Sequence, residues 1–236
     1  MPSRAPFPAT AWTRVLAAQA DTPESRDALE EICKAYWPAI YTYLRALGCA
    51  REEARDFTQD FLADFISRGY LHKVARERGR LRSYIMQSVR NHLSNERRDA
   101  ARKKRGGGQT IVSMDEMEHF DVPAAPERAD SWFDRRWAWS VLRRSMDRMA
   151  AHFEERGRAP LFEALKAGLA NPEKMKPYAE LGAALGMTEG HVKLEIHRAR
   201  KRLADELRSE VAATLETGGD VETELRYLLS VLGETT

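Results

Sequence analysis

Residues 178–203 read YAELGAALGMTEGHVKLEIHRARKRL, and this stretch decides the predicted fold. Apolar residues recur every three or four positions on both sides of Gly186, which is the pattern of two amphipathic helices. Gly186 is suited to end the first helix in a left-handed conformation, and the hydroxyl of Thr188 can cap the second. The buried stripe expected on the second helix is Val192, Ile196, Ala199, Leu203 and Leu207.

The other faces of this second helix concentrate positive charge. They carry His191, Lys193, His197, Arg198, Arg200, Lys201 and Arg202. A short helix, a tight turn and a basic second helix predict a helix-turn-helix, whose second helix enters the DNA major groove. The alternative is an ordinary helical hairpin whose charges are solvated.

The composition of the chain restricts its class. With 236 residues it has room for two small domains, and its net charge is only +2. Cys33 and Cys49 fit no metal-ligand spacing, so we expect them to pack as small hydrophobic side chains in a reducing cytosol. The sequence has neither an apolar run of membrane-spanning length nor a signal-peptide core, which predicts a soluble cytoplasmic protein.

No constellation of residues indicates catalysis. We find no nucleophile beside a base and no carboxylate pair, and we therefore predict that the protein is not an enzyme and has no cofactor. His191, Glu195 and His197 are types that bind metals, but at this spacing they do not share one helix face, so no metal site is predicted.

Helical periodicity extends over nearly the whole sequence and predicts an all-α fold with two helical domains joined by a flexible linker. We expect a helical domain over 1–105, a flexible acidic linker over 106–130 and the helix-turn-helix domain over 131–210. A C-terminal extension over 211–236 contains an amphipathic helix. Two apolar faces are predicted in the C-terminal half: Trp139, Leu142, Met146, Met149 and Phe153, and then Leu225, Leu228, Leu229 and Leu232.

An acidic stripe follows the predicted helix over about 51–67. Its members are spaced so that they align beside the apolar face: Glu53, Asp56, Asp60 and Asp64, with Gln59 at the border. Like charges at this spacing repel by a few tenths of a kcal/mol per pair, and a docking surface for a basic partner would explain that cost. A solvated helix face is the alternative.

The next predicted helix, over about 80–105, is basic. Between Lys73 and Arg105 there are twelve Lys or Arg and three acidic residues. Cations, amides and an aromatic ring alternate at positions that we expect to face outward: Arg82, Tyr84, Gln87, Arg90, Asn91, Asn95, Arg97 and Arg98. Cations neutralise phosphates, amides read base edges and rings stack on unpaired bases, so this face is predicted to bind nucleic acid.

Taken in order, these motifs resemble those of a bacterial RNA polymerase sigma factor of the extracytoplasmic-function (ECF) group. The segment EARDFTQDF at 53–61 resembles the polymerase-binding part of sigma region two, and 78–105 resembles the part that melts and reads the minus-ten element. Residues 178–203 resemble region four, which binds the minus-thirty-five element and the polymerase flap. FDRRWA at 133–138 and ETELRYLL at 222–229 resemble a subgroup seen in planctomycetes and myxobacteria.

The resemblance implies a dissociable specificity subunit, monomeric when free, with core RNA polymerase and promoter DNA as partners. An anti-sigma factor or a Ser/Thr kinase is the regulator that it implies. The implied contacts with the polymerase clamp coiled coil are Glu53, Asp56, Gln59 and Asp60. Those with the minus-ten element are Arg80, Arg82, Tyr84, Arg90, Asn91, Asn95, Arg97 and Arg98. Those with the minus-thirty-five element are Thr188, His191, Lys193, Leu194 and Arg198.

Several positions depart from the family pattern. Arg55 stands where an acidic residue is usual, Tyr84 stands for Trp, and Leu194 and Glu195 replace Ser and Arg. We expect Glu195 to be able to accept a hydrogen bond from a cytosine amino group. Phosphorylation of Thr58 would add about −1.5 to −2 charge beside the acidic stripe and offset Arg55; the alternative is a packed helix residue.

Two questions remain open at the level of sequence. The helix over 221–232 could cover a DNA-binding face or complete the core of the C-terminal domain. A sigma-like mimic, or a helix-turn-helix regulator that does not initiate transcription, is the alternative function. A regulator would use the same helix-turn-helix, whereas a mimic would share the fold but usually lacks the DNA-contacting cations, which are present here as Lys193 and Arg198.

Overall fold

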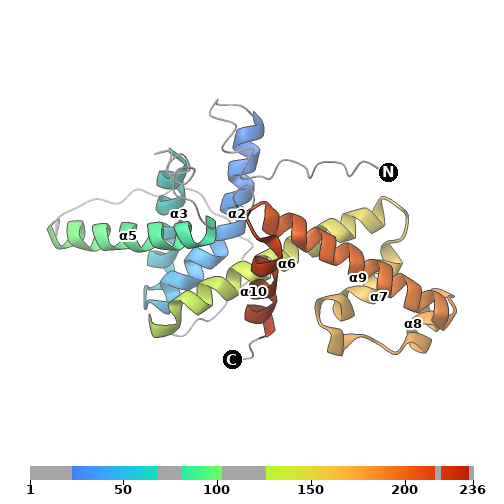
Figure 1. Cartoon of the computed structure of the whole chain (residues 1–236). Coiled ribbons are helices and arrows are strands. Elements are labelled where there is room, and N and C mark those ends of the chain that lie inside the picture. Colours follow the sequence, from blue (N-terminus) through green and yellow to red (C-terminus); the bar gives the residue numbers. More distant parts are fainter. Residues whose placement is uncertain (1–22, 68–80, 103–125, 216–218, 234–236) are drawn as a thin grey trace. The chain divides into compact units, whose positions relative to one another are not determined.

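The computed structural model describes residues 23–67, 81–102, 126–215 and 219–233. Within these ranges the chain has eight α-helices and two short 3-10 helices and no strand, which confirms the all-α prediction (Figure 1). The described residues divide into two compact units: the first ends at Arg136 and the second begins at Trp137, inside one helix.

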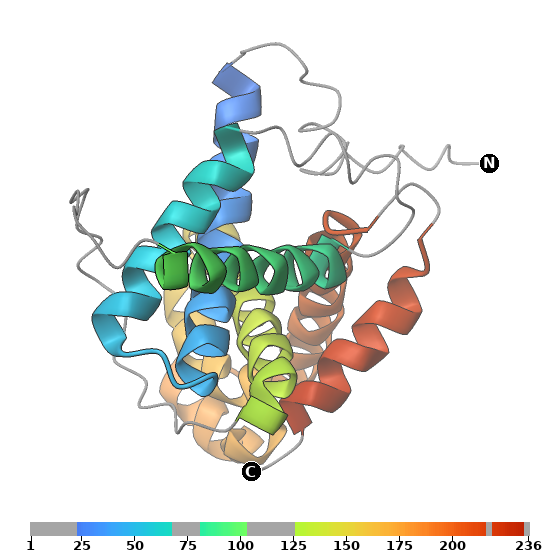
Figure 2. The same ribbon diagram turned by 90° about the vertical axis from the view of Figure 1, so that its left-hand side faces the viewer.

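The first unit is built from helices α2 (Pro23–Ala46), α3 (Arg51–Ser67) and α5 (Leu81–Arg102), with the opening turns of α6 (Ala129–Glu154). α3 lies along α2, and α5 crosses both, as Figure 2 shows. The core takes its apolar side chains from all of these helices: Tyr36, Ile40, Leu44, Phe61, Phe65, Leu81, Ile85, Val89 and Phe133. Phe133, on α6, stacks against Tyr36 with ring centroids 6.5 Å apart and meets the edge of Tyr43 at 6.3 Å.

Gly48 forms the turn between α2 and α3. Its φ of 88° lies in the left-handed region, where glycine is favoured because it has no Cβ. The two cysteines are free: Cys49 is buried and Cys33 is half-buried. Burial, with a smaller contribution from the charge of Glu30, raises the pKa of the Cys33 thiol to about 11.

The second unit contains the rest of α6, α7 (Ala159–Ala170), α8 (Tyr178–Leu185), α9 (Glu189–Ala212) and α10 (Val221–Gly233). The short helix η2 (Pro172–Lys174) connects α7 to α8. The long helix α9 packs against α7, α8 and α10. No described helix is both long and apolar enough to cross a membrane.

α10 packs on the C-terminal part of α9. Its buried residues are Glu224, Leu225, Leu228 and Val231, and Arg208 of α9 forms an ion pair with Glu222 at 2.7 Å. These contacts favour the expectation that the last helix completes a core. The prediction of Leu229 on the buried face is wrong, because α10 is rotated so that Val231 points inward and Leu229 is 51% exposed.

Two further predictions are corrected around α6. The last residues of the predicted flexible linker, 126–130, form the 3-10 helix η1 (Pro126–Arg128) and the start of α6; Ala129 is buried there. Residues 106–125 lie outside the described part of the chain. Trp139, predicted to face the core, is 46% exposed, because the buried stripe passes through Trp137, Ala138 and Val141 instead.

Candidate nucleic-acid interface

The turn between α8 and α9 depends on two glycines. Gly186 has φ 64° and ends α8 in the left-handed conformation, as its position in the sequence predicted. Gly182 lies one turn earlier, and its carbonyl accepts the N–H of Met187 at 2.9 Å. A Cβ on Gly182 would lie 2.6 Å from the Met187 carbonyl oxygen, so this close approach requires glycine.

Thr188 is the N-cap of α9, as predicted. Its hydroxyl oxygen accepts the backbone N–H of His191 at 3.3 Å, which satisfies one of the amides left unpaired at a helix start. The predicted stripe of Val192, Ile196, Ala199, Leu203 and Leu207 is buried throughout. The cap and the stripe together fix which face of α9 is turned to solvent.

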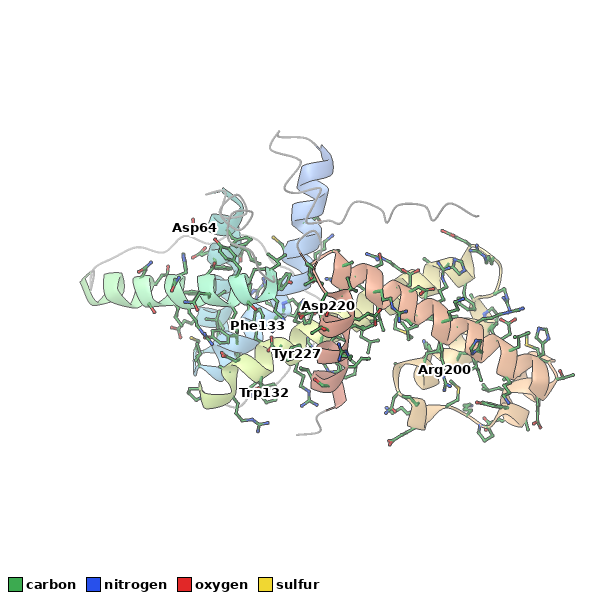
Figure 3. The ribbon with its side chains drawn as sticks, viewed as in Figure 1. Asp64, Trp132, Phe133, Arg200, Asp220 and Tyr227 are labelled. Carbon is green, nitrogen blue, oxygen red and sulfur yellow. The ribbon has the colours of Figure 1, made fainter. Side chains whose placement is uncertain are left out.

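The outward face of α9 is basic. Beyond Glu189 and Gly190 at its start, its exposed residues within four turns of the cap are His191, Lys193, Leu194, His197, Arg198, Arg200 and Lys201. Figure 3 shows the side chains along α9, with Arg200 labelled. Of the predicted minus-thirty-five contacts, the structure therefore places His191, Lys193, Leu194 and Arg198 on one helix face, beside the cap residue.

Glu195 lies between the buried stripe and the exposed face of α9, with its carboxylate 3.7 Å from the His191 ring. It is 3% exposed, and its carboxylate pairs with Arg158 at 2.7 Å and with Arg198 at 3.0 Å. Burial raises the pKa of Glu195, but the hydrogen bonds and charges of the two arginines outweigh it and hold the pKa below its ordinary value. The expectation that Glu195 can contact a base is wrong, because its carboxylate is enclosed between α9 and the start of α7.

A second buried acid, missed in the sequence, joins α9 to α6. Glu210 is 3% exposed and pairs with Arg144 at 2.7 Å and with Arg148. Periodicity gave no signal for Glu195 or Glu210, since both read as polar positions on a charged helix. Except for Arg198, their arginine partners lie many residues away in the sequence.

On α5, the expectation that Arg82 faces outward is wrong. Arg82 is 5% exposed, and its guanidinium pairs with the buried carboxylate of Asp134 on α6 at 2.5 Å. Removing a charge from water costs free energy, and the attraction between two buried opposite charges offsets that cost. Asp134 lies 52 residues further along the chain, so the local sequence does not reveal it.

Arg90 is also engaged, but nearer the surface. Its Nε donates to the Tyr43 hydroxyl at 3.0 Å, and its Nη2 pairs with Asp130 at the start of α6. The hydrogen bond to Asp130, followed by that to Tyr43, raises the pKa of the Arg90 guanidinium. Its side chain is 38% exposed, and that of Asp130 is 54% exposed.

The other predicted minus-ten residues are more dispersed. Asn91 and Asn95 are exposed, and Asn91 accepts a hydrogen bond from Gln87 at 3.2 Å. Tyr84 is half-buried, with its ring centroid 6.3 Å from that of Phe65. Arg80 and the side chains of Arg97 and Arg98 lie outside the description.

The acidic stripe of α3 faces solvent. Glu53, Asp56 and Asp60 are exposed, while Gln59 and Asp64 are half-buried; Figure 3 labels Asp64. Glu53 also has a structural role, because its carboxylate accepts the N–H of Ala50 at 3.1 Å at the start of α3. Asp56 and Asp60 form no ion pair with any other residue in the described ranges.

Thr58 is turned away from this stripe. It is fully buried, and its hydroxyl donates to the carbonyl of Ala54 at 2.6 Å. This is the packed helix residue that the sequence left as the alternative to a phosphorylation site. A kinase could reach the hydroxyl only after local unfolding of α3.

Within the described ranges no three His, Cys, Asp or Glu side chains are grouped as metal ligands. Comparisons of the chain with protein-family models, curated proteins and solved structures found no match.

Proposed function

We propose that this protein is a sigma factor, which binds core RNA polymerase and directs initiation at promoters with minus-ten and minus-thirty-five elements. The observation that carries the proposal is the exposed basic face of α9, set by the Thr188 cap and the left-handed Gly186 turn after α8. A capped helix of this kind, packed on a shorter one, has the form of a helix-turn-helix that presents its second helix to the major groove.

The acidic stripe of α3 supplies the second part of the proposal. Asp56 and Asp60 lie one helical turn apart on an exposed face, so together they offer a negative surface to a basic partner. The partner that the sequence resemblance implies is the clamp coiled coil of the polymerase. Residues 1–105 would then bind the clamp and the minus-ten element, and 131–210 the minus-thirty-five element and the flap.

Two binding sites on one chain increase the overall affinity for the polymerase–promoter complex. When one unit is bound, the other searches only a small volume, so two weak contacts give a tight complex. On this proposal the protein acts in the cytoplasm, is monomeric when free, and has neither a cofactor nor a catalytic activity of its own.

The test is run-off transcription with purified core polymerase on genomic promoter fragments, with and without the protein. Discrete transcripts that require the protein would establish a sigma factor. A complex with polymerase that gives no transcripts would contradict the initiating role, and the absence of any complex would contradict the proposal as a whole.

A charge-reversed variant tests the docking face. We expect Asp56→Lys/Asp60→Lys to abolish binding to core polymerase, because it places positive charge against a basic partner. The matched control is Asp147→Lys/Glu154→Lys, which makes the same charge change at two exposed positions of α6. Equal binding of both double variants in a pull-down would refute docking through α3.

One observation favours a second candidate, a DNA-binding regulator that does not initiate transcription. Arg82 and Arg90, two of the cations expected to hold the minus-ten strand, are occupied by Asp134 and Asp130. A regulator would use the α9 face without the α5 face. It would bind duplex DNA in the absence of polymerase and give no run-off product.

A further inference from the structure

The exposed, basic face of α9 contains one apolar side chain, and binding to phosphates does not account for it. Leu194 is 44% exposed, and within the described residues it is one of three large hydrophobic side chains with such exposure, beside Trp139 and Leu229. Of these three, Leu194 is the one that lies on α9. Single exposed leucines are common on protein surfaces, so its surroundings decide whether it has a role.

Those surroundings are polar and open, and they include one arginine. Residues three and four positions away on a helix are neighbours, so Leu194 is flanked by His191, His197 and Arg198. The remaining neighbour is Gly190, where an added Cβ would meet nothing within 4 Å. The apolar side chain of Leu194 is therefore uncovered on its N-terminal side and has positive or hydrogen-bonding groups on the others.

Such a face fits a ligand that is anionic at its edges and apolar at one point inside. Duplex DNA offers that combination: phosphates border the major groove, and the 5-methyl group of thymine is the apolar feature of its floor. The first turns of a helix are the ones that approach base edges in this mode of binding. Leu194 lies six positions after the N-cap, within these turns.

Glu195, which follows Leu194 in the sequence, does not occupy the surface that would face the bases. Glu195 is buried and held by Arg158 and Arg198, so it leaves the groove-facing surface to its neighbours. The same contact restrains Arg198, whose side chain is still 61% exposed.

We propose that Leu194 reads thymine in duplex DNA, by packing against the 5-methyl group in the major groove while the exposed cations of α9 contact the flanking phosphates. This inference rests on the proposed binding of DNA by α9 and names the base that α9 selects there.

The test removes the 5-methyl group from the DNA and, separately, the isopropyl group of Leu194 from the protein. Duplexes are selected from a randomised pool by the full-length protein with core polymerase, and each is then prepared with thymine or with uracil. Uracil keeps the hydrogen-bonding groups of thymine and lacks only the methyl. We expect the wild-type protein to bind the uracil form about fourfold more weakly, which is the factor that burial of one methyl supplies.

Variants assign that loss to one residue. Leu194→Ala should lower the thymine-to-uracil affinity ratio by about the same fourfold. Leu229→Ala, which shortens an equally exposed leucine on α10, should keep the wild-type ratio. The change of ratio between variants is the readout, so other thymine contacts in the complex cancel. Alanine is compatible with the helix at an exposed position, so the folded state is retained.

Two results would overturn the inference. A wild-type ratio of one, or the same ratio in wild type and Leu194→Ala, would refute the thymine contact while leaving DNA binding by α9 intact. Failure of the wild-type protein to select any duplex would overturn the proposed function as well.

Discussion

The basic face of α9 and the basic face of α5 look alike in the sequence and differ in the structure. On α9, Lys193 and Arg200 extend from a capped helix whose buried stripe lies on the other side. On α5, Arg82 is enclosed against Asp134, and Arg90 is paired with Asp130 and Tyr43. On α9 the cation paired with a buried acid, Arg198, keeps a side chain that is 61% exposed, whereas on α5 Arg82 is enclosed with its acidic partner.

The difference shows that a count of cations does not measure the charge available for binding. What matters is whether an acidic side chain from a distant segment reaches each cation. In the first unit those acids come from the opening turns of α6, although Asp130 and Asp134 lie 40 and 52 residues after the arginines that they pair with. Such acids neutralise a surface that appears positive when the helix is considered alone.

The largest effect in this comparison is expected at the buried pair of Arg82 and Asp134. Removing one partner, as in Asp134→Ala, takes the paired carboxylate away from the buried guanidinium of Arg82 and should lower the free energy of unfolding by about 3–5 kcal/mol. Urea-induced unfolding followed by circular dichroism measures this loss. Arg143→Ala, at an exposed position on the same helix, is the control and should change stability by less than about 0.5 kcal/mol.

A double variant separates charge from packing. Arg82→Met/Asp134→Leu replaces both partners by apolar side chains and should recover most of the lost stability. If Asp134→Ala were as stable as wild type, Arg82 would be free to serve as a DNA contact and the contrast between α5 and α9 would disappear.

Local signals in the sequence predicted much of α9. The cap at Thr188, the turn at Gly186 and the stripe through Val192 and Ile196 all depend on residues within a few positions of one another, and all are confirmed. The same holds for the exposed acidic residues Glu53, Asp56 and Asp60 of α3. Features that rest on neighbours in sequence could be read without a structure.

Features that depend on residues far apart in the sequence could not be predicted from the sequence alone. Arg82 and Glu195 are charged, and the helical pattern assigned them to solvent, but Asp134 and Arg158 hold them in the interior. Trp139 was assigned to the core because it is large and apolar. The buried stripe of α6 is shifted by a fraction of a turn, and the packing of other helices decides such a shift.

Alanine at two glycines near the start of α9 is expected to change the free energy of unfolding by smaller amounts and in opposite directions. Gly182→Ala places a Cβ 2.6 Å from the Met187 carbonyl oxygen, which is backbone and cannot rotate away, and should cost about 1–3 kcal/mol. Gly190→Ala adds its Cβ in open space near the start of α9 and should stabilise the protein by about 0.5–1 kcal/mol.

Thermal unfolding of both variants measures the pair. The α8–α9 turn is held by close backbone contact if the two midpoints move in opposite directions. A Gly182→Ala variant with the wild-type midpoint would mean that the turn tolerates a wider separation of the helices.

The smallest effect is expected at the exposed pair of Arg90 and Asp130, and it bears most directly on the contrast between α5 and α9. Screening by solvent limits this pair, so Asp130→Asn should change stability by no more than about 1 kcal/mol. If Arg90 contacts DNA once it is released, affinity for a single-stranded oligonucleotide should rise by about two- to fivefold, the factor that corresponds to an exposed ion pair.

Part of such a gain would come merely from the removal of a negative charge, and two controls separate that part. Asp147→Asn removes the same charge from an exposed position of α6 that forms no ion pair within the described residues, so it reports the general effect. Combining Asp130→Asn with Arg90→Ala removes the cation that Asp130 holds. A gain that exceeds that of Asp147→Asn and vanishes without Arg90 means that the opening turns of α6 suppress the basic face of α5, and that this face would otherwise resemble that of α9.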